Sequence, residues 1–243
     1  MLTTVEDATG AFIRKFEQMV ELDAADIRAI RALAFTAGTI RSGQHLVREG
    51  DVVETCWLLL GGYACRQKTS RNGNRQIVSF HMTGDLLDLQ HLMLPVADHS
   101  IQAITDLSVA CVSTAALRAL ARERPAIGEG FWRDTLIDAS IYREWVLNIG
   151  QRDAKSRIAH MLCEFAVRRE AAGLGAPERF DLPMTQQQIA DATGLTPVHV
   201  NRMLQTLGAE GVIDRDGRRV SIVDWERMRR VADFEPAYLH LAA

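Results

Sequence analysis

The sequence lacks several features that mark other classes of protein. Its 243 residues contain no apolar run of about 18 residues, so a transmembrane helix is excluded. The amino terminus has no basic segment followed by an apolar core, and we expect no signal peptide. The four cysteines form neither a Cys-x-x-Cys pair nor a disulfide framework, which fits a reducing compartment. Together these absences predict a cytoplasmic protein without membrane contact.

Signatures of common enzyme classes are also absent. No P-loop, no Gly-x-Ser-x-Gly elbow and no paired catalytic carboxylates occur. A cupin-type metal centre needs two histidines one residue apart, but His45, His81, His91 and His99 stand singly. We therefore expect no catalytic residue and no metal site, and a cupin-type metal-dependent enzyme is kept as an alternative function.

The balance of charges differs along the chain. The whole sequence carries 28 Lys and Arg against 31 Asp and Glu, a net charge of −3 that is unusual for a DNA-binding protein. Residues 151–230 alone hold 13 basic and 11 acidic residues, an excess of +2. This small excess places any nucleic-acid contact in the carboxy-terminal part.

The segment from Phe35 to Ser113 has the pattern of an antiparallel β-domain. It breaks into short runs, rich in β-branched residues and separated by turn signals such as Asn72-Gly73. The expected strands cover residues 35–40, 45–47, 56–60, 63–68, 75–81, 100–105 and 108–112. Many short strands with Gly-rich turns predict a sandwich or barrel.

Helical patterns lie on both sides of this segment. Residues 11–33 carry two amphipathic stripes, with Asp23 as the expected cap of the second helix. A long helix follows Pro125 and extends from about residue 126 to 152, with apolar residues on more than one face. Such a helix packs on its own domain and, we predict, on the same helix of a second subunit. The residues predicted for that seam are Phe131, Ile137, Ile141 and Trp145.

Residues 185–208 have the pattern of two short helices joined by one tight turn. Thr185 is a good cap for the first helix, and Gly194 can take the left-handed conformation that ends it. Thr196 and Pro197 are suited to begin the second helix. A helix-turn-helix of this kind presents polar side chains of its second helix to the DNA major groove. An ordinary helical hairpin inside a core is the alternative.

The segment after this motif predicts a wing, two short strands around Asp216-Gly217. The fold class is therefore α+β, in three parts. Residues 1–122 form a double-stranded β-roll of the jelly-roll or cupin-like type with leading helices. Residues 123–152 form the dimerisation helix, and residues 153–243 form a winged helix-turn-helix.

This order of parts resembles the Crp/Fnr family of bacterial transcription regulators over roughly residues 20–225. Residues 195–202, with residues 208–213 behind them, carry the strongest match, and the Gly84-Asp85 turn carries a weaker one. The resemblance implies a homodimer that reads a palindromic operator in double-stranded DNA, with RNA polymerase as a further partner. A cyclic-nucleotide-binding adaptor without DNA binding is the other alternative.

The resemblance gives Arg202 the position of a guanine reader, and a guanidinium can donate two hydrogen bonds to O6 and N7 of guanine. Val198 stands where the family often has a glutamate, so we expect an atypical half-site. The other expected base-reading residues are Val198, His199 and Asn201. The expected phosphate contacts are Thr185, Gln186, Thr196, Arg218 and Arg219.

The resemblance also implies a ligand pocket for a small-molecule effector in the β-roll. Its expected residues are Gly84, Asp85, Leu86, His99 and Ser100. His99 stands where cyclic-nucleotide-binding members have an arginine for the phosphate, so we expect no tight binding of cAMP. No cysteine precedes Cys56, which argues against an iron–sulfur cluster, and haem ligation by His91 is not expected. Redox sensing through Cys111 or Cys163 is a further alternative.

Overall fold

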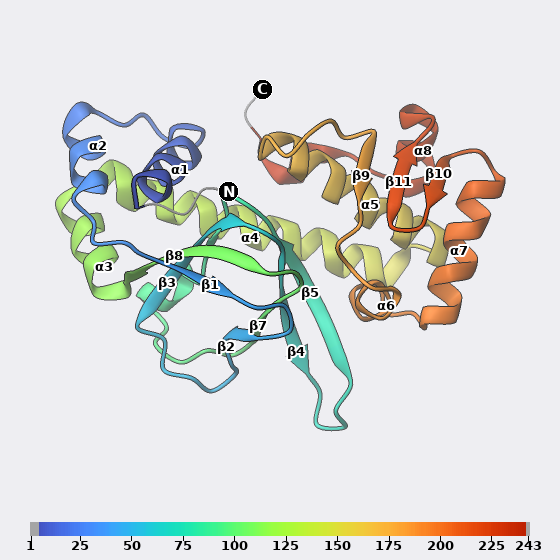
Figure 1. Cartoon of the computed structure of the whole chain (residues 1–243), viewed down its shortest axis with the longest axis horizontal. Coiled ribbons are helices and arrows are strands. Elements are labelled where there is room, and N and C mark those ends of the chain that lie inside the picture. Colours follow the sequence, from blue (N-terminus) through green and yellow to red (C-terminus); the bar gives the residue numbers. More distant parts are fainter. Residues whose placement is uncertain (1–4, 242–243) are drawn as a thin grey trace. The chain divides into compact units, whose positions relative to one another are not determined.

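A computed structural model describes residues 5–241 of the chain (Figure 1). The predicted helices and strands occur in it in the predicted order. The chain divides into two compact units. The first holds the described residues within 1–68 and 81–139 together with Leu241, and the second holds Thr69–Phe80 and Ser140–His240. The prediction that there is no signal peptide rests on the amino terminus, where residues 1–4 lie outside the described part, and it stays a prediction. Among the described helices, none has the length and hydropathy needed to cross a bilayer.

The β-roll contains two four-stranded antiparallel sheets. Its strands are β1 (Thr36–Ile40), β2 (His45–Val47), β3 (Thr55–Gly61), β4 (Ala64–Thr69), β5 (Arg75–His81), β6 (Leu86–Leu87), β7 (Ser100–Ala103) and β8 (Leu107–Ser113). One sheet has the order β1-β8-β3-β6 and the other β2-β7-β4-β5. Leu59, Ile101 and Val109 belong to a buried cluster contributed by both sheets, which is the core of the roll. Strand β6 and the 3-10 turn η1 (Leu89–Leu92) were not predicted, because they are too short to show a period.

A second apolar cluster lies between one of these sheets and four helices. The helices are α1 (Val5–Glu17), α2 (Ala24–Arg31), α3 (Thr114–Glu123) and α4 (Pro125–Gln151). Alternate residues of β3, such as Leu58, point into this cluster, while Leu59 points into the roll. The ring of Phe16 packs edge-on against Phe131 at 5.4 Å between centroids. The side chain of Asp23 caps α2 as predicted, accepting hydrogen bonds from the amides of Ala25 and Asp26.

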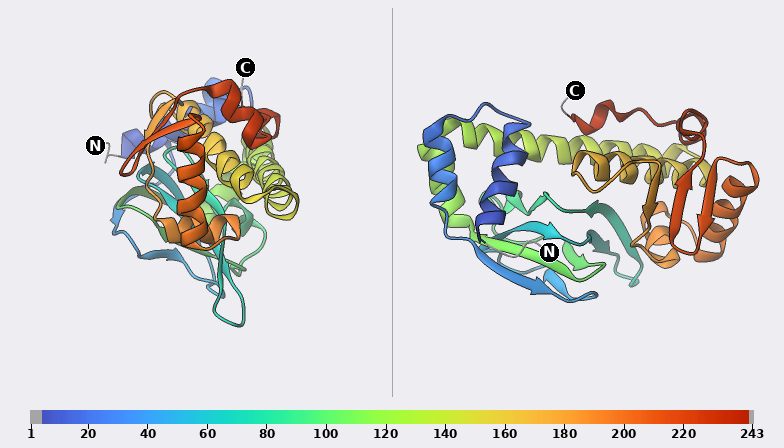
Figure 2. Two further views of the ribbon diagram at one scale, coloured as in Figure 1. Left: turned by 90° about the vertical axis from the view of Figure 1, so that its right-hand side faces the viewer. Right: turned by 45° about the horizontal axis from the view of Figure 1, so that its top comes forward.

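The predicted long helix is confirmed as α4. The prediction that Phe131, Ile141 and Trp145 face a second subunit is wrong. Phe131, Ile141 and Trp145 are each only 6% exposed, because the chain itself covers them, and Ile137 is half-buried. The exposed apolar residues of α4 include Trp132 (75%), Leu136 (60%) and Val146 (73%). At 3.6 residues per turn these three lie within a stripe about 80° wide. We call these three residues the outer stripe of α4, the long helix that Figure 2 shows from two further sides.

The second unit contains the predicted winged helix-turn-helix. Its elements are α5 (Ala154–Ala171), β9 (Arg179–Asp181), α6 (Gln186–Thr193), α7 (Pro197–Ala209), β10 (Ile213–Asp216), β11 (Arg219–Ile222), α8 (Trp225–Ala232) and η2 (Pro236–Leu239). Helix α5 packs against α6, α7 and α8. The wing has three strands in the order β10-β11-β9, one more than predicted. Strand β9 was missed because it is only three residues long.

Gly130 is a position in α4 where a side chain would collide with a neighbour. A Cβ atom added there would overlap the ring of Phe16. We predict that Gly130→Ala lowers the free energy of unfolding by about 1–3 kcal/mol, because overpacking outweighs the higher helix propensity of alanine. Gly150→Ala on the same helix meets no neighbouring atom within 4 Å and should not destabilise. Guanidinium unfolding of both variants measures the difference, and equal stabilities would contradict this packing.

Candidate functional site

The turn between α6 and α7 forms as the capping residues predict. The Thr185 hydroxyl accepts a hydrogen bond from the Gln188 amide at 3.2 Å, and the Gln188 side chain accepts one from the Thr185 amide at 2.8 Å. Gly194 ends α6 with a φ of +67°, in the left-handed region. The Thr196 hydroxyl caps α7 by accepting from the amide of His199. Four local signals therefore fix the turn before any tertiary contact is counted.

Burial divides α7 into two faces. Val200, Leu204 and Leu207 are buried, so this face holds the helix on its domain. Val198 and Arg202 are exposed, and both were predicted to read bases. The face of α7 opposite the core is therefore available for a partner.

Two residues predicted to contact DNA are bonded to each other. The Gln186 side-chain amide donates a hydrogen bond to Asn201 Oδ1 at 3.1 Å, joining the start of α6 to α7. Asn201 keeps its own amide group to donate elsewhere. Asn201 and His199 are both half-buried, so they lie at the edge of the exposed face rather than at its centre.

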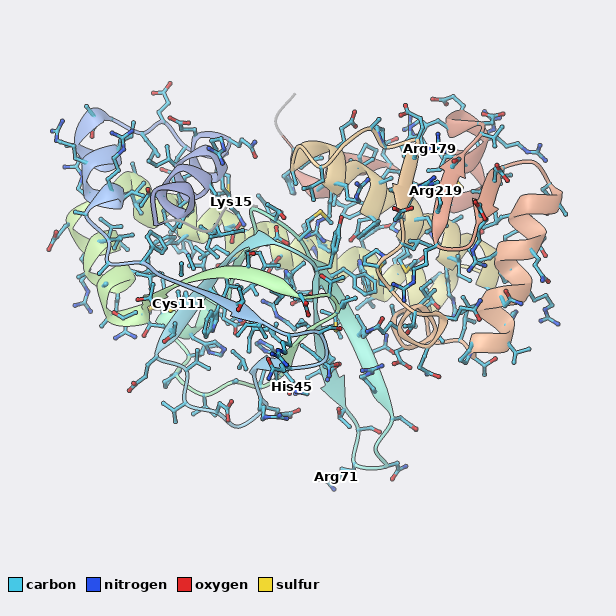
Figure 3. The ribbon with its side chains drawn as sticks, viewed as in Figure 1. Lys15, His45, Arg71, Cys111, Arg179 and Arg219 are labelled. Atoms are coloured by element: carbon cyan, nitrogen blue, oxygen red, sulfur yellow. The ribbon has the colours of Figure 1, made fainter. Side chains whose placement is uncertain are left out.

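The wing carries the predicted basic residues in exposed positions. Arg218 lies in the turn before β11, and Arg219 begins that strand (Figure 3). Arg219 pairs with Asp181 of β9, with 3.3 Å between Nε and Oδ1. Exposed pairs of this kind contribute less than about 1 kcal/mol, so a phosphate can compete with Asp181 for Arg219.

The five residues predicted for the effector pocket make their polar contacts with different partners. Gly84 forms a turn at a φ of +94°, and Leu86 is a buried strand residue paired with Leu58. The Asp85 carboxylate accepts from the Met82 amide at 3.1 Å. The Ser100 hydroxyl accepts from the Glu49 amide at 2.9 Å. None of these contacts joins two of the five residues, and the effector pocket stays a prediction.

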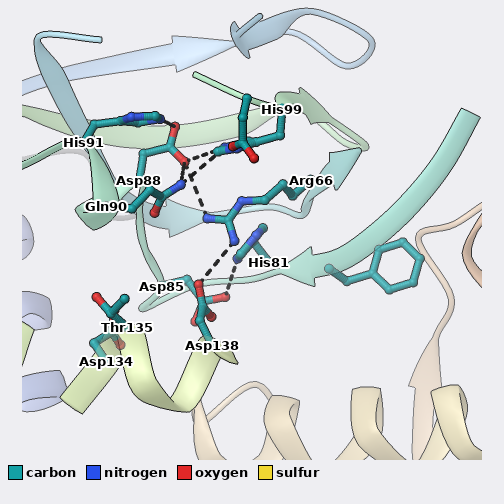
Figure 4. A network of polar contacts seen from close by, with 12 residues as sticks. Arg66, His81, Asp85, Asp88, Gln90, His91, His99, Asp134, Thr135 and Asp138 are labelled. Atoms are coloured by element: carbon teal, nitrogen blue, oxygen red, sulfur yellow. Dashed lines mark hydrogen bonds and ion pairs between the residues drawn. The ribbon is translucent and has the colours of Figure 1, made fainter. Parts of the chain in front are cut away.

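Of the five, His99 contacts Asp88, which is the centre of a buried group of ligand-type residues (Figure 4). His99 Nε2 lies 2.9 Å from Asp88 Oδ1. Burial acts to raise the pKa of Asp88, but the hydrogen bond with His99 and the charge of Arg66 outweigh it and hold the pKa below its usual value. Asp88 is therefore an ionised carboxylate inside the roll.

Comparisons with known proteins identify both units. Residues 38–124 match the cyclic nucleotide-binding domain model, and residues 156–231 match the Crp-like helix-turn-helix domain model. The transcriptional activator protein FnrL of Cereibacter sphaeroides is 30% identical over 192 residues, which cover 77% of this chain and 77% of that protein. The chain belongs to the Crp/Fnr family of transcription regulators.

Other members of the Crp/Fnr family support the same assignment. The nitrogen fixation regulation protein FixK of Rhizobium meliloti is 27% identical and covers 80% of this chain and 86% of its own. The structure of FixK2 from Bradyrhizobium japonicum superposes with a TM-score of 0.75 at 26% identity, covering 82% of this chain and 98% of that one. The chain is thus a DNA-binding transcriptional regulator, and the family implies a role without catalysis.

The sequence reading of this Crp/Fnr regulator missed Asp88 and Arg66. The spacing Asp88-x2-His91-x7-His99 holds three ligand-type residues, but it lacks the two histidines one residue apart of a cupin-type centre. Arg66 lies on β4 and is only 4% exposed, and a buried guanidinium must find an anion. That requirement is the one signal that could have pointed to a buried carboxylate near β4.

The left-handed conformation of Gly194 gives a direct test of the turn. We predict that Gly194→Ala lowers the free energy of unfolding by about 1–2 kcal/mol, because a Cβ atom is disfavoured in the left-handed region. Gly194→Asn should cost less, since asparagine visits that region readily. Urea unfolding of both variants provides the comparison. Equal losses would show that crowding, not backbone conformation, is responsible.

Proposed function

We propose that this regulator is a homodimer that reads a two-fold symmetric operator through α7 of each subunit. The exposed face of α7 carries the proposal: Val198 and Arg202 point away from the core, and no ion pair within residues 5–241 engages the Arg202 guanidinium. An unpaired arginine on a recognition helix can donate two hydrogen bonds to a guanine. Val198 can pack on a thymine methyl group, and His199 and Asn201 can donate at the edge.

Contacts to phosphates would hold the motif in register on the duplex. The residues assigned to this role are Thr185, Gln186, Thr196, Arg218 and Arg219. They lie at helix starts or on the wing, where amides and guanidinium groups face a backbone that flanks the major groove. They fix position without reading sequence, so the half-site depends on α7.

The second subunit is assigned to the outer stripe of α4. Trp132, Leu136 and Val146 expose large apolar surfaces on one face of a 27-residue helix. A stripe of this kind is stabilised when a second copy covers it, and two-fold symmetry then pairs the two recognition helices. The names of several relatives describe activators, which favours contact with RNA polymerase as a further step.

The signal is assigned to the β-roll, and a cyclic nucleotide does not fit it. His99 is bonded to the buried Asp88 carboxylate, and a phosphate placed there would be repelled by that anion. Neither an iron–sulfur cluster nor haem at His91 is expected. Burial raises the pKa of the Cys163 thiol to about 12, so its reactive thiolate is disfavoured at neutral pH.

Replacing Arg202 tests base recognition. An operator is first selected from random DNA, and binding is followed by fluorescence anisotropy at fixed salt. We expect Arg202→Ala to cost about 1–3 kcal/mol on that operator and to relax preference at one base pair per half-site. The matched variant Arg218→Ala should weaken operator and random DNA equally. Equal losses on both DNAs for Arg202→Ala would reduce this residue to a phosphate contact.

Replacing Val146 tests the dimer. A glutamate there would place two like charges at the proposed seam, and we expect Val146→Glu to weaken dimerisation at least about tenfold, or 1.4 kcal/mol. Sedimentation equilibrium measures the effect. Val52→Glu is the matched control, because Val52 is similarly exposed but belongs to the β-roll. A monomeric wild-type protein, or an unchanged Val146→Glu dimer, would contradict the assignment.

A further inference from the structure

A cluster of buried ligand-type side chains lies inside the β-roll. Asp88, His91 and His99 are each at most 4% exposed, and one nitrogen or oxygen atom of each lies within 4.8 Å of the other two. Asp88 follows β6, His91 belongs to the turn η1, and His99 precedes β7. Figure 4 shows the Asp88 carboxylate between the two imidazole rings. Among the described residues, this is the one group with three such donors close together.

The hydrogen bond of His91 orients a lone pair toward Asp88. His91 Nδ1 lies 2.6 Å from the carbonyl oxygen of Leu94, which can only accept, so Nδ1 carries the proton. In the neutral ring, Nε2 is then an electron-pair donor. Nε2 lies 3.9 Å from Asp88 Oδ2, and both atoms are buried without a hydrogen-bond partner. Two buried atoms that face each other with lone pairs repel unless a cation lies between them.

His99 is held in the same manner from its other side. Its Nδ1 lies 2.8 Å from the Asp98 carboxylate and its Nε2 lies 2.9 Å from Asp88 Oδ1. Metal-binding histidines often donate their outer N–H to a carboxylate, which fixes the tautomer and directs the inner nitrogen to the ion. His99 follows this arrangement: its outer nitrogen, Nδ1, contacts Asp98, and its inner nitrogen, Nε2, faces Asp88.

The backbone at Asp88 supports a functional origin for this cluster. Its φ of 69° and ψ of 32° lie in the left-handed region, which side chains other than glycine seldom occupy. Strained conformations of this kind persist where the surrounding structure needs a side chain in one place. In this conformation the Asp88 carboxylate lies between the two histidines, as Figure 4 shows.

We propose that Asp88, His91 and His99 bind one divalent transition-metal ion of the Zn²⁺ or Fe²⁺ class, and that this ion is the signal read by the β-roll. Two imidazole nitrogens and one carboxylate oxygen form a donor set that these ions prefer. At metal–ligand distances of about 2.0–2.1 Å, neighbouring donors lie about 3 Å apart, as His99 Nε2 and Asp88 Oδ1 already do. The three ligand atoms lie within 4.8 Å of one another, so His91 would move closer to complete the site. This proposal departs from the expectation, drawn from the sequence, that the chain has no metal site.

Arg66 gives the metal site a route to α4. Its Nη2 lies 3.4 Å from Asp88 Oδ1 and its Nη1 lies 3.2 Å from Asp138 Oδ2 on α4. A bound cation would neutralise Asp88 and weaken its hold on Arg66, which then depends more on Asp138. Occupation of the site would thus change the contact made with the helix assigned to the dimer. This last step rests on the proposed function, whereas metal binding itself does not.

Metal binding is tested on the full-length protein after chelator treatment and dialysis. Calorimetric titration with Zn²⁺ should give one ion per chain, and Co²⁺ should give the visible absorption of a nitrogen- and oxygen-ligated ion. Asp98→Asn, which touches only the outer nitrogen of His99, should weaken Zn²⁺ binding about 10–100-fold. Asp88→Asn, His91→Gln and His99→Gln should weaken it further. Asparagine tolerates the left-handed backbone at residue 88.

His45→Gln is the matched control, because this histidine belongs to β2 and not to the cluster, and it should bind Zn²⁺ as the wild type does. Absence of stoichiometric binding by the wild type would overturn the proposal. Equal binding by the wild type and all three ligand variants would also overturn it. If a ligand variant fails to fold, the wild-type Tm decides: a rise with Zn²⁺ supports the site, and an unchanged Tm overturns it.

The route through Arg66 is tested by operator binding with and without Zn²⁺. We expect Zn²⁺ to change the operator affinity of the wild type, and Asp138→Asn to bind Zn²⁺ normally but lose this change. An operator affinity that ignores Zn²⁺ in the wild type would overturn the signalling half, while calorimetry judges the site separately. Failure of the wild type to bind any operator, with or without metal, would instead count against the proposed function.

Discussion

The two apolar faces of helix α4 are the constraint on which the other parts depend. A helix with one apolar stripe is satisfied by one core, but α4 buries Phe131 and Trp145 and still exposes Trp132 and Val146. The buried face forms part of the core beneath the β-roll and part of the second unit. Within residues 5–241 nothing covers the exposed face, and this is the face assigned to the proposed dimer.

The DNA-binding unit follows the same logic on a smaller scale. Burial of Val200 and Leu204 fixes which side of α7 faces the core, and the opposite side, which is proposed to read bases, is left exposed. A net charge of −3 does not prevent this, because recognition depends on the charge near the contact and not on the sum. In the proposed complex, the arginines of α7 and the wing supply that local charge.

The β-roll contains a different kind of constraint, a set of buried polar groups that must satisfy one another. Asp88 faces Arg66 and two histidines, and each of these groups would be costly if left alone in the interior. Because buried polar groups must be paired, such a cluster is rare, and its presence points to a role for the residues in it. The ligand atoms of Asp88, His91 and His99 lie within 4.8 Å of one another. The Arg66 guanidinium also pairs with Asp138 of α4.

The sequence by itself determined the longer helices and strands and the helix-turn-helix motif. Capping residues, turn glycines and periodic apolar positions are local signals, so Thr185, Gly194 and Pro197 located the helix-turn-helix to the residue. Only the tertiary structure decided which stripe of α4 is exposed, because periodicity cannot say which of two apolar faces meets the chain's own core. It also decided that Asp88 meets His91 and His99, since their proximity depends on a left-handed residue and a turn too short to leave a pattern.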